Sequence, residues 1–146
     1  MKKVLVVMGS DSDLKVMEKC VDRLKSFDIP VEVRICSAHR TPAVAEQLAK
    51  NAAEEGFGVI IAAAGKAAHL GGVLAAYTTL PVIGVPMATS VMGGMDSLLS
   101  IVQMPKGIPV ATVAIDGADN AAILAAQMIA LSDDALAQKL AQFKAD

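Results

Sequence analysis

The sequence feature that most constrains the fold is a repeated alternation of short apolar runs with segments of helical periodicity. The apolar runs are Val4–Val7, Val31–Cys36, Val59–Ala64, Pro81–Val85 and Pro109–Ile115. Runs that are this short and apolar on both faces are typical of buried parallel strands. The alternation therefore predicts an α/β fold, with a doubly wound parallel sheet of about five strands and right-handed crossovers.

The segments between and after these runs have the apolar spacing of helices. The expected helices begin near Leu14, at Pro42 after Thr41 as N-cap, near Leu98 with Asp96 as cap, at Asn120 and near Asp133. No strand signal follows the last two segments. We therefore expect extra C-terminal helices, of which the last packs away from the sheet.

Length and charge narrow the class of protein. A chain of 146 residues suits one domain, spanning 1–146. Its 13 basic and 15 acidic residues give no basic footprint for nucleic acid or an anionic membrane surface. Without a secretory signal before Gly9, we predict a cytoplasmic protein, with Cys20 and Cys36 as small buried hydrophobic residues.

One long stretch, Ala67–Met95, contains no Asp, Glu, Lys or Arg. Glycines and prolines interrupt it, so it is not expected to be a membrane helix. Its alanine-rich surface exceeds what a monomer of this size should need to bury. This favours a subunit interface, and the alternative is a generous core.

The first polar cluster, Gly9–Asp13, follows the first predicted strand and opens a helix. Ligands bind at the carboxyl ends of strands in open α/β sheets, where helix N-termini favour anions. Ser10 and Asp13 also have the spacing of a capping box, which needs no ligand. Four consecutive polar side chains exceed that need, so a binding site is favoured over a cap.

Two further clusters follow the second and third strands. In Ser37–Pro42, His39 can transfer a proton near neutral pH, and Arg40 can hold a phosphate through its fork of donors. In Gly65–Gly72, small residues allow the backbone to approach a ligand, and Lys66 and His69 add donors. Because such turns meet at one sheet edge, we expect the clusters to form one site.

Four motifs are specific in combination: Gly9–Asp13, Ser37–Pro42, Ala67–Leu70 and Asp96–Pro105. They closely resemble the PurE family, the 5-(carboxyamino)imidazole ribonucleotide mutases of purine biosynthesis. The resemblance spans nearly the whole chain. It implies a flavodoxin-like three-layer αβα sandwich and a homo-octamer.

The resemblance also implies an isomerase of IMP biosynthesis, which moves a carboxyl group from the exocyclic nitrogen of an imidazole ribonucleotide to ring carbon C4. Decarboxylation and recarboxylation would convert 5-carboxyamino-1-(5-phospho-D-ribosyl)imidazole to 5-amino-1-(5-phospho-D-ribosyl)imidazole-4-carboxylate, with no metal or organic cofactor. His39 matches the catalytic acid/base. The residues predicted to bind substrate are Ser10, Asp13, Ser37, Arg40, Gly65, Lys66, His69 and Leu70.

The chain departs from the family pattern at two places. Where these mutases usually read Gly-Gly-Ala-Ala-His-Leu-Pro-Gly, Lys66 and Gly71 stand here, and Ala88-Thr89 replaces the usual Gln-Ser. A basic residue at Lys66 is similar to the related carboxylases, which use free carbon dioxide, but their loop lacks the histidine found at His69. We expect a mutase, with the carboxylase as second hypothesis and a non-catalytic phosphate-binding module as third.

Overall fold

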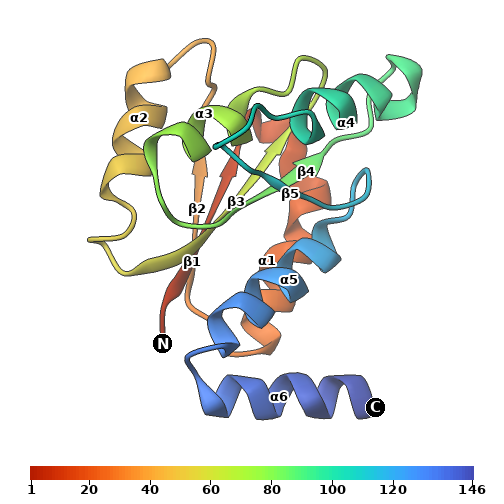
Figure 1. Ribbon diagram of the computed structural model, residues 1–146. Helices are drawn as coiled ribbons and strands as arrows, with labels where there is room; N and C mark the ends of the chain where they lie inside the picture. The colour runs from red at the N-terminus through yellow and green to blue at the C-terminus, as the bar shows by residue number, and fades with distance from the viewer.

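Residues 1–146 are described by a computed structural model, in which a parallel sheet lies between two layers of helices (Figure 1). The five strands have the order β2-β1-β3-β4-β5, and every pairing is parallel. In chain order the elements are β1 (Lys3–Met8), η1 (Asp11–Asp13), α1 (Leu14–Ser26), β2 (Val31–Ile35), α2 (Pro42–Asn51), β3 (Phe57–Ala64), α3 (Leu70–Tyr77), β4 (Val82–Pro86), η2 (Met92–Gly94), α4 (Met95–Val102), β5 (Ala111–Thr112), α5 (Ala118–Ala130) and α6 (Asp134–Ala145). The predicted three-layer, flavodoxin-like fold is confirmed.

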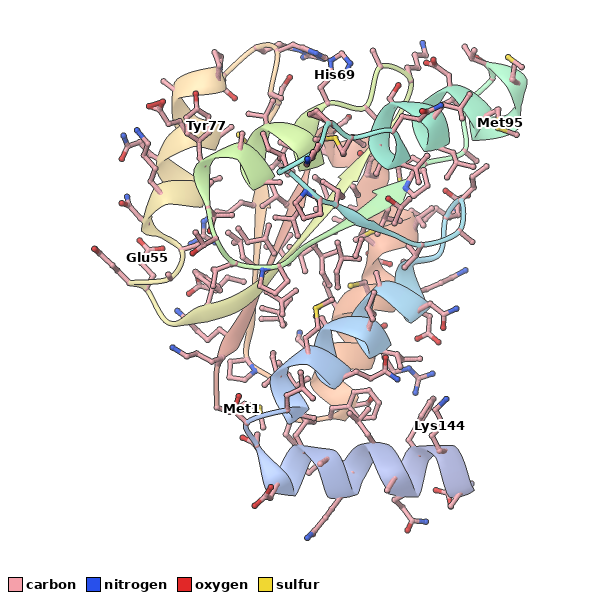
Figure 2. All side chains as sticks on the ribbon, in the orientation of Figure 1. Met1, Glu55, His69, Tyr77, Met95 and Lys144 are labelled. Atoms are coloured by element: carbon pink, nitrogen blue, oxygen red, sulfur yellow. The ribbon has the colours of Figure 1, made fainter.

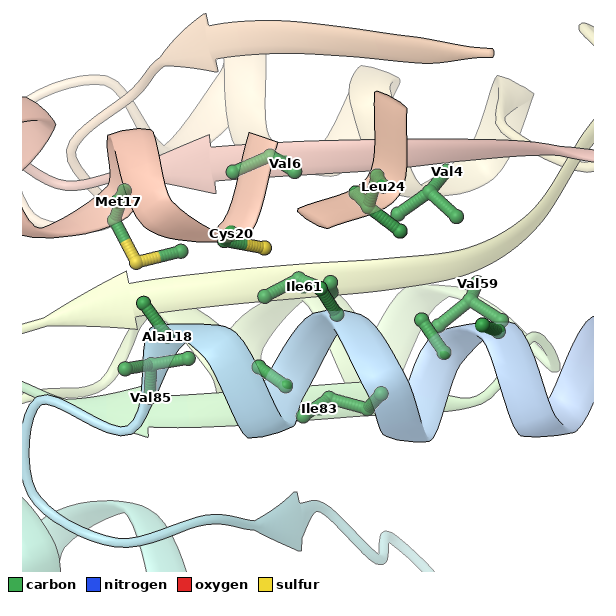
Figure 3. Close-up of a cluster of buried hydrophobic side chains, with 14 of the residues drawn as sticks. Val4, Val6, Met17, Cys20, Leu24, Val59, Ile61, Ile83, Val85 and Ala118 are labelled. Atoms are coloured by element: carbon green, nitrogen blue, oxygen red, sulfur yellow. The ribbon is translucent and has the colours of Figure 1, made fainter. Parts of the chain in front are cut away.

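Alternate residues of the central strand β1 face the two helical layers. Val4, Val6 and Met8 pack with residues of α1 and α5, as Figure 3 shows for the first two. Leu5 and Val7 belong to a second core on the opposite face, with α2, α3 and α4. Because both faces of the sheet are covered, its central strands are apolar throughout, which is why they could be recognised in the sequence.

Gly84 of β4 allows a close approach between the sheet and α4. A Cβ atom at this position would collide with the side chain of Ile101. Ile101 is buried against the strand as a result. This contact seats α4 over β4, beside the edge at which the polar clusters lie.

Three local predictions need correction. The helix α3 was not predicted, because its residues lie in the charge-free stretch and show no amphipathic pattern. β5 is only two residues long, Ala111–Thr112, because it is a half-exposed edge strand. Asp96 does not cap α4: it lies in the first turn, and Gly94 in a left-handed conformation is the N-cap.

The last helix packs away from the sheet, as expected. Leu136 of α6 is fully buried in the core shared with α5. The guanidinium of Arg23, on α1, lies 4.8 Å from the ring centroid of Phe143 and donates to Asp119 of α5 at 2.7 Å. Neither α6 nor any other helix is both long and apolar enough to span a membrane.

Candidate active site

The carboxyl ends of the central strands open into one cavity of about 420 Å³. In Figure 2, His69 lies at the top, at the edge toward which the strands of Figure 1 run. The lining residues are Gly9, Ser10, Ser12, Asp13, Ser37, Ala38, His39, Arg40, Ala64, Gly65, Lys66, Ala67, His69, Leu70, Met87, Ala88 and Thr89. Every site residue predicted from the sequence is among them.

The first cluster forms the single-turn helix η1 before α1. The Ser10 hydroxyl lies 2.9 Å from the Ser12 hydroxyl and accepts from the Ser12 backbone N–H at 3.3 Å. Asp13 makes no side-chain cap to α1. A reciprocal capping box is therefore absent, and the Asp13 carboxylate remains in the cavity lining.

Burial raises the pKa of the Asp13 carboxyl above its usual value. The nearby charge of Asp116 acts in the same direction, while a hydrogen bond from the Ser10 backbone opposes both effects. Burial is the largest of these causes. The Asp13 carboxylate therefore carries its charge in a poorly solvated place, where a ligand hydroxyl or N–H would stabilise it.

The second cluster is a tight turn closed by Ser37. Its hydroxyl accepts from the Arg40 N–H at 3.2 Å, and its carbonyl accepts from the Thr41 hydroxyl at 2.9 Å. Thr41 stands at the predicted N-cap position of α2, but its side chain makes no cap, because it closes this turn instead. The turn leaves His39 and Arg40 exposed at the cavity.

The two histidines of the chain meet across the cavity mouth. Nε2 of His39 lies 2.8 Å from Nδ1 of His69, and the rings are nearly perpendicular, with centroids 5.0 Å apart. One nitrogen must donate and the other accept, so the bond holds a single proton between the two rings. Two clusters that are far apart in sequence thus form one proton-transfer pair.

The third cluster is held from behind by α4. Lys66 has a left-handed backbone, with φ of 55°, although it is not glycine. Its N–H donates to the hydroxyl of the fully buried Ser97 at 2.8 Å, and its carbonyl accepts from the Ser100 hydroxyl at 3.4 Å. The Asp96–Pro105 motif therefore contributes to the site by fixing the Lys66 turn rather than by lining the cavity.

The cavity lining contains two cations that no carboxylate neutralises. Neither Arg40 nor Lys66 takes part in any ion pair of the structure. Free cationic side chains at a cavity attract anionic groups, and a guanidinium binds phosphate or carboxylate through two parallel hydrogen bonds. The cavity is therefore suited to a small molecule with two separate anionic groups. No three His, Cys, Asp or Glu side chains lie together in an arrangement that could hold a metal ion.

The wall that follows β4 was not predicted as part of the site, although Ala88-Thr89 stood out as a departure from the family pattern. Met87, Ala88 and Thr89 line the cavity, and the Ala88 N–H donates to the Asp116 carboxylate at 2.9 Å. A signal was available, because Asp116-Gly117 is a common turn pair and follows the fifth predicted strand. Its position at the same sheet edge follows from the parallel topology.

Comparison with curated proteins gives matches over almost the whole chain. It is 53% identical over 146 residues to N5-carboxyaminoimidazole ribonucleotide mutase of Pyrococcus abyssi, covering 100% of this chain and 84% of that protein. It is 54% identical over 144 residues to the enzyme of the same name from Thermotoga maritima, covering 99% and 84%. It is also 52% identical over 140 residues to the chloroplastic phosphoribosylaminoimidazole carboxylase of Vigna aconitifolia, covering 96% of this chain but 25% of that protein.

Solved structures agree with these matches. The crystal structure of Treponema denticola PurE has a TM-score of 0.86 and 31% identity, covering 97% of this chain and 88% of that chain. The family model described as AIR carboxylase matches residues 3–146. The chain therefore belongs to the AIR carboxylase (PurE) family.

Proposed function

We propose that this protein is an N5-carboxyaminoimidazole ribonucleotide mutase, an isomerase of purine biosynthesis. Relatives of that name share more than half of its residues over nearly its whole length. The observation that carries the proposal is the His39–His69 pair, which lies at a cavity with two unpaired cations. The reaction needs proton transfer, and the substrate brings two anionic groups.

The ribonucleotide binds with its phosphate toward Arg40 and its carboxylate toward Lys66. Arg40 offers a fork of donors, and the Ser10 hydroxyl with the start of η1 adds others. Asp13 accepts from a ribose hydroxyl, which offsets the cost of its burial. Gly65 and Leu70 shape the wall beside the imidazole, and Ser37 fixes the turn that presents Arg40.

His39 supplies one proton and recovers one. Protonation of the exocyclic nitrogen by His39 breaks the nitrogen–carboxyl bond, and carbon dioxide leaves with the nitrogen retaining the bonding electron pair. C4 then attacks the carbon dioxide, and His39 removes the proton from C4. Protons balance over the cycle, so His39 ends it in its starting protonation state.

His69 holds His39 in place during this cycle. The bond between Nε2 of His39 and Nδ1 of His69 holds the His39 ring in one orientation at the cavity. The cavity must also keep carbon dioxide beside C4 between the two half-reactions. Small side chains at Ala38, Ala64 and Ala67 leave room for a ligand close to the backbone.

The second candidate is a carboxylase that uses free carbon dioxide. Lys66 and the name of the Vigna aconitifolia relative favour it. His69 favours the mutase, because the carboxylases that the sequence otherwise resembles at Lys66 lack this histidine. Assays with each ribonucleotide, with and without bicarbonate, distinguish the two: the mutase acts on the carboxyamino substrate at a rate independent of added bicarbonate.

The proposal extends to a cytoplasmic homo-octamer built from a single domain, 1–146. Support comes from apolar side chains exposed along η2 and α4. Met92 is 77% exposed, and Val91, Met95, Leu99 and Val102 are each at least 40% exposed. Several large apolar side chains exposed within one short segment are typical of a subunit interface.

The decisive experiment replaces His39 by asparagine. His39→Asn keeps a similar side-chain size and removes acid/base capacity, so turnover should fall by about 10²–10⁴-fold while ribonucleotide affinity stays near wild type. Exchange of the substrate's C4 proton with solvent, followed by NMR in D₂O, is the direct measurement, because the product carries a carboxylate in place of that proton. Near wild-type exchange would assign the proton transfer to His69 instead. Wild-type protein that binds the ribonucleotide without turning it over would support the phosphate-binding module.

A further inference from the structure

Asp116, in the turn between β5 and α5, holds the end of β4 and the loop segment that follows it at two points. Its backbone N–H donates to the Pro86 carbonyl at 2.8 Å, and its carboxylate accepts from the Ala88 N–H at 2.9 Å. The two bonds flank Met87, which together with Ala88 lines the cavity. Asp116 therefore fixes the backbone of the cavity wall without lining the cavity itself.

The turn has adopted a costly conformation to make these contacts. Asp116 has a φ of 58°, in the left-handed region that residues other than glycine seldom adopt. Beside it, a Cβ on Gly117 would lie 2.8 Å from the Ala114 carbonyl oxygen, so only glycine fits there. Aspartate tolerates this region better than most residues, and it is also the acceptor that Ala88 needs.

The wall that Asp116 holds also contacts the end of η2 and the end of β3. A Cβ built on Gly94 would lie 3.0 Å from the Ala88 Cα, so the end of η2 packs directly against the wall. The Met87 N–H donates to the Ala64 carbonyl at 3.0 Å, which ties the wall to the end of β3. The hydrogen bond from the Ala88 N–H to the Asp116 carboxylate is thus one of a few contacts that fix the position of the wall.

From these contacts we infer that Asp116 is a positioning residue of the substrate site, which sets the wall formed by Met87, Ala88 and Thr89 through its bond to the Ala88 N–H. The inference rests on the proposed mutase function for its kinetic consequence. Its structural part, the bond itself, is independent of that function. Loss of the acceptor should loosen the wall and weaken substrate binding, with little effect on the proton transfer at His39.

Two variants separate the hydrogen bond from the backbone requirement. Asp116→Gly keeps the left-handed backbone and removes the acceptor, whereas Asp116→Asn keeps both the backbone preference and one acceptor oxygen. We expect Asp116→Gly to raise KM about 3- to 10-fold with kcat little changed, the range that corresponds to one lost hydrogen bond, and Asp116→Asn to restore KM. A merely structural residue would lower the melting temperature and leave KM unchanged.

Hydrogen–deuterium exchange of the peptide containing Ala88 tests the bond without reference to catalysis. The Ala88 amide should exchange faster in Asp116→Gly than in wild type and at the wild-type rate in Asp116→Asn. Wild-type exchange and wild-type KM in Asp116→Gly would overturn the inference, as would Asp116→Asn matching Asp116→Gly in both. If wild type turns over no carboxyaminoimidazole ribonucleotide, the proposed function fails, and the exchange rates still decide whether Asp116 holds the wall.

Discussion

At the scale of single residues, Lys66 is the residue of the candidate site that has an unfavourable backbone conformation. A left-handed backbone costs a residue other than glycine about 1–2 kcal/mol. The bonds from the Lys66 peptide to Ser97 and Ser100 use only backbone atoms of Lys66, so glycine would keep them. A strained lysine at a cavity lining is the observation behind the hypothesis that its ammonium group contacts the ligand.

Replacement of Lys66 by glycine should separate stability from binding. Relief of strain, set against the greater freedom of an unfolded glycine, should leave the free energy of unfolding unchanged or raised by up to about 1 kcal/mol. Affinity for the carboxylated ribonucleotides should fall by about 1 kcal/mol or more, while the unsubstituted aminoimidazole ribonucleotide is unaffected. Urea denaturation and calorimetric titration measure the two effects. If the affinity for both kinds of ligand fell equally, Lys66 would not be the residue that binds the carboxylate.

Arg40 should be sensitive to the shape of its head group as well as its charge. Arg40→Lys keeps the cation and loses the planar fork, so ribonucleotide binding should weaken by roughly 1–3 kcal/mol. Titration with the ribonucleotide and with its dephosphorylated riboside checks the partner, because only the first should respond. Arg34→Lys is the matched control, since Arg34 is exposed on β2 and pairs with Glu32 rather than lining the cavity. If Arg40→Lys weakened the affinity for both ligands equally, Arg40 would not be the residue that binds the phosphate.

At the scale of elements, the strands that are buried on both faces of the sheet were the ones predicted best from the sequence. The central strands β1, β3 and β4 were predicted closely, because both helical layers require them to be apolar. The helix α3 was missed because it is itself nearly all apolar, which removes the periodicity that marks a helix. The predicted length of β5 was too great, because its apolar run continues beyond the strand. The later residues of the run lead into the Asp116 turn and do not pair as part of the sheet.

The candidate site was predictable to the extent that its residues follow strands. All three polar clusters come directly after β1, β2 and β3, so parallel topology alone brings them to one edge. The His39–His69 bond could not be predicted, because it depends on side-chain directions in two loops. The support from Ser97 and Ser100 was equally hidden, since it depends on how Ile101 seats α4 against Gly84.

The N-terminal turn of α1 should show a pH-dependent conflict between stability and function. Because the pKa of Asp13 is raised in the folded protein, the folded state binds more protons, so wild-type stability falls as pH rises from 3.8 through the folded pKa. Asp13→Asn should therefore stabilise the fold more at pH 7 than at pH 3.5, while ribonucleotide binding weakens. Urea midpoints at both pH values measure this.

The matched control for this turn is Asp11→Asn, because Asp11 lies in the same single-turn helix but is exposed. An exposed carboxylate is already hydrated, so at pH 7 Asp11→Asn should change the urea midpoint less than Asp13→Asn does. A stabilisation by Asp13→Asn that is no larger at pH 7 than at pH 3.5 would show that burial does not oppose the Asp13 charge.

At the scale of the whole molecule, the charge-free stretch has two different roles. Its first half is core: Ala68 is buried just before α3, Leu70 and Leu74 are buried on α3 itself, and Val82 continues the same core on β4. This part is therefore explained by a large hydrophobic core, which was the alternative to a subunit interface in the sequence analysis. Its large exposed apolar side chains are Tyr77 at the end of α3 and, at its own end, Val91, Met92 and Met95. The surface around Met92 continues along α4 through Leu99 and Val102. The expected interface is therefore narrower than the stretch and extends beyond it.

Met92 is the sharpest probe of self-association, because its side chain is 77% exposed and its φ of 51° holds it in a left-handed turn. Wild-type protein should scatter light as a particle of about 120 kDa, eight times the chain mass of 15.0 kDa. A carboxylate in an apolar interface is costly to desolvate, so Met92→Asp should shift the mass toward that of smaller species at micromolar concentration. Leu131→Asp is the matched control: Leu131 is 89% exposed but lies after α5, outside this surface, and its substitution should leave the mass unchanged. A wild-type mass of one chain would refute assembly itself, whereas an intact assembly in Met92→Asp would place the interface elsewhere.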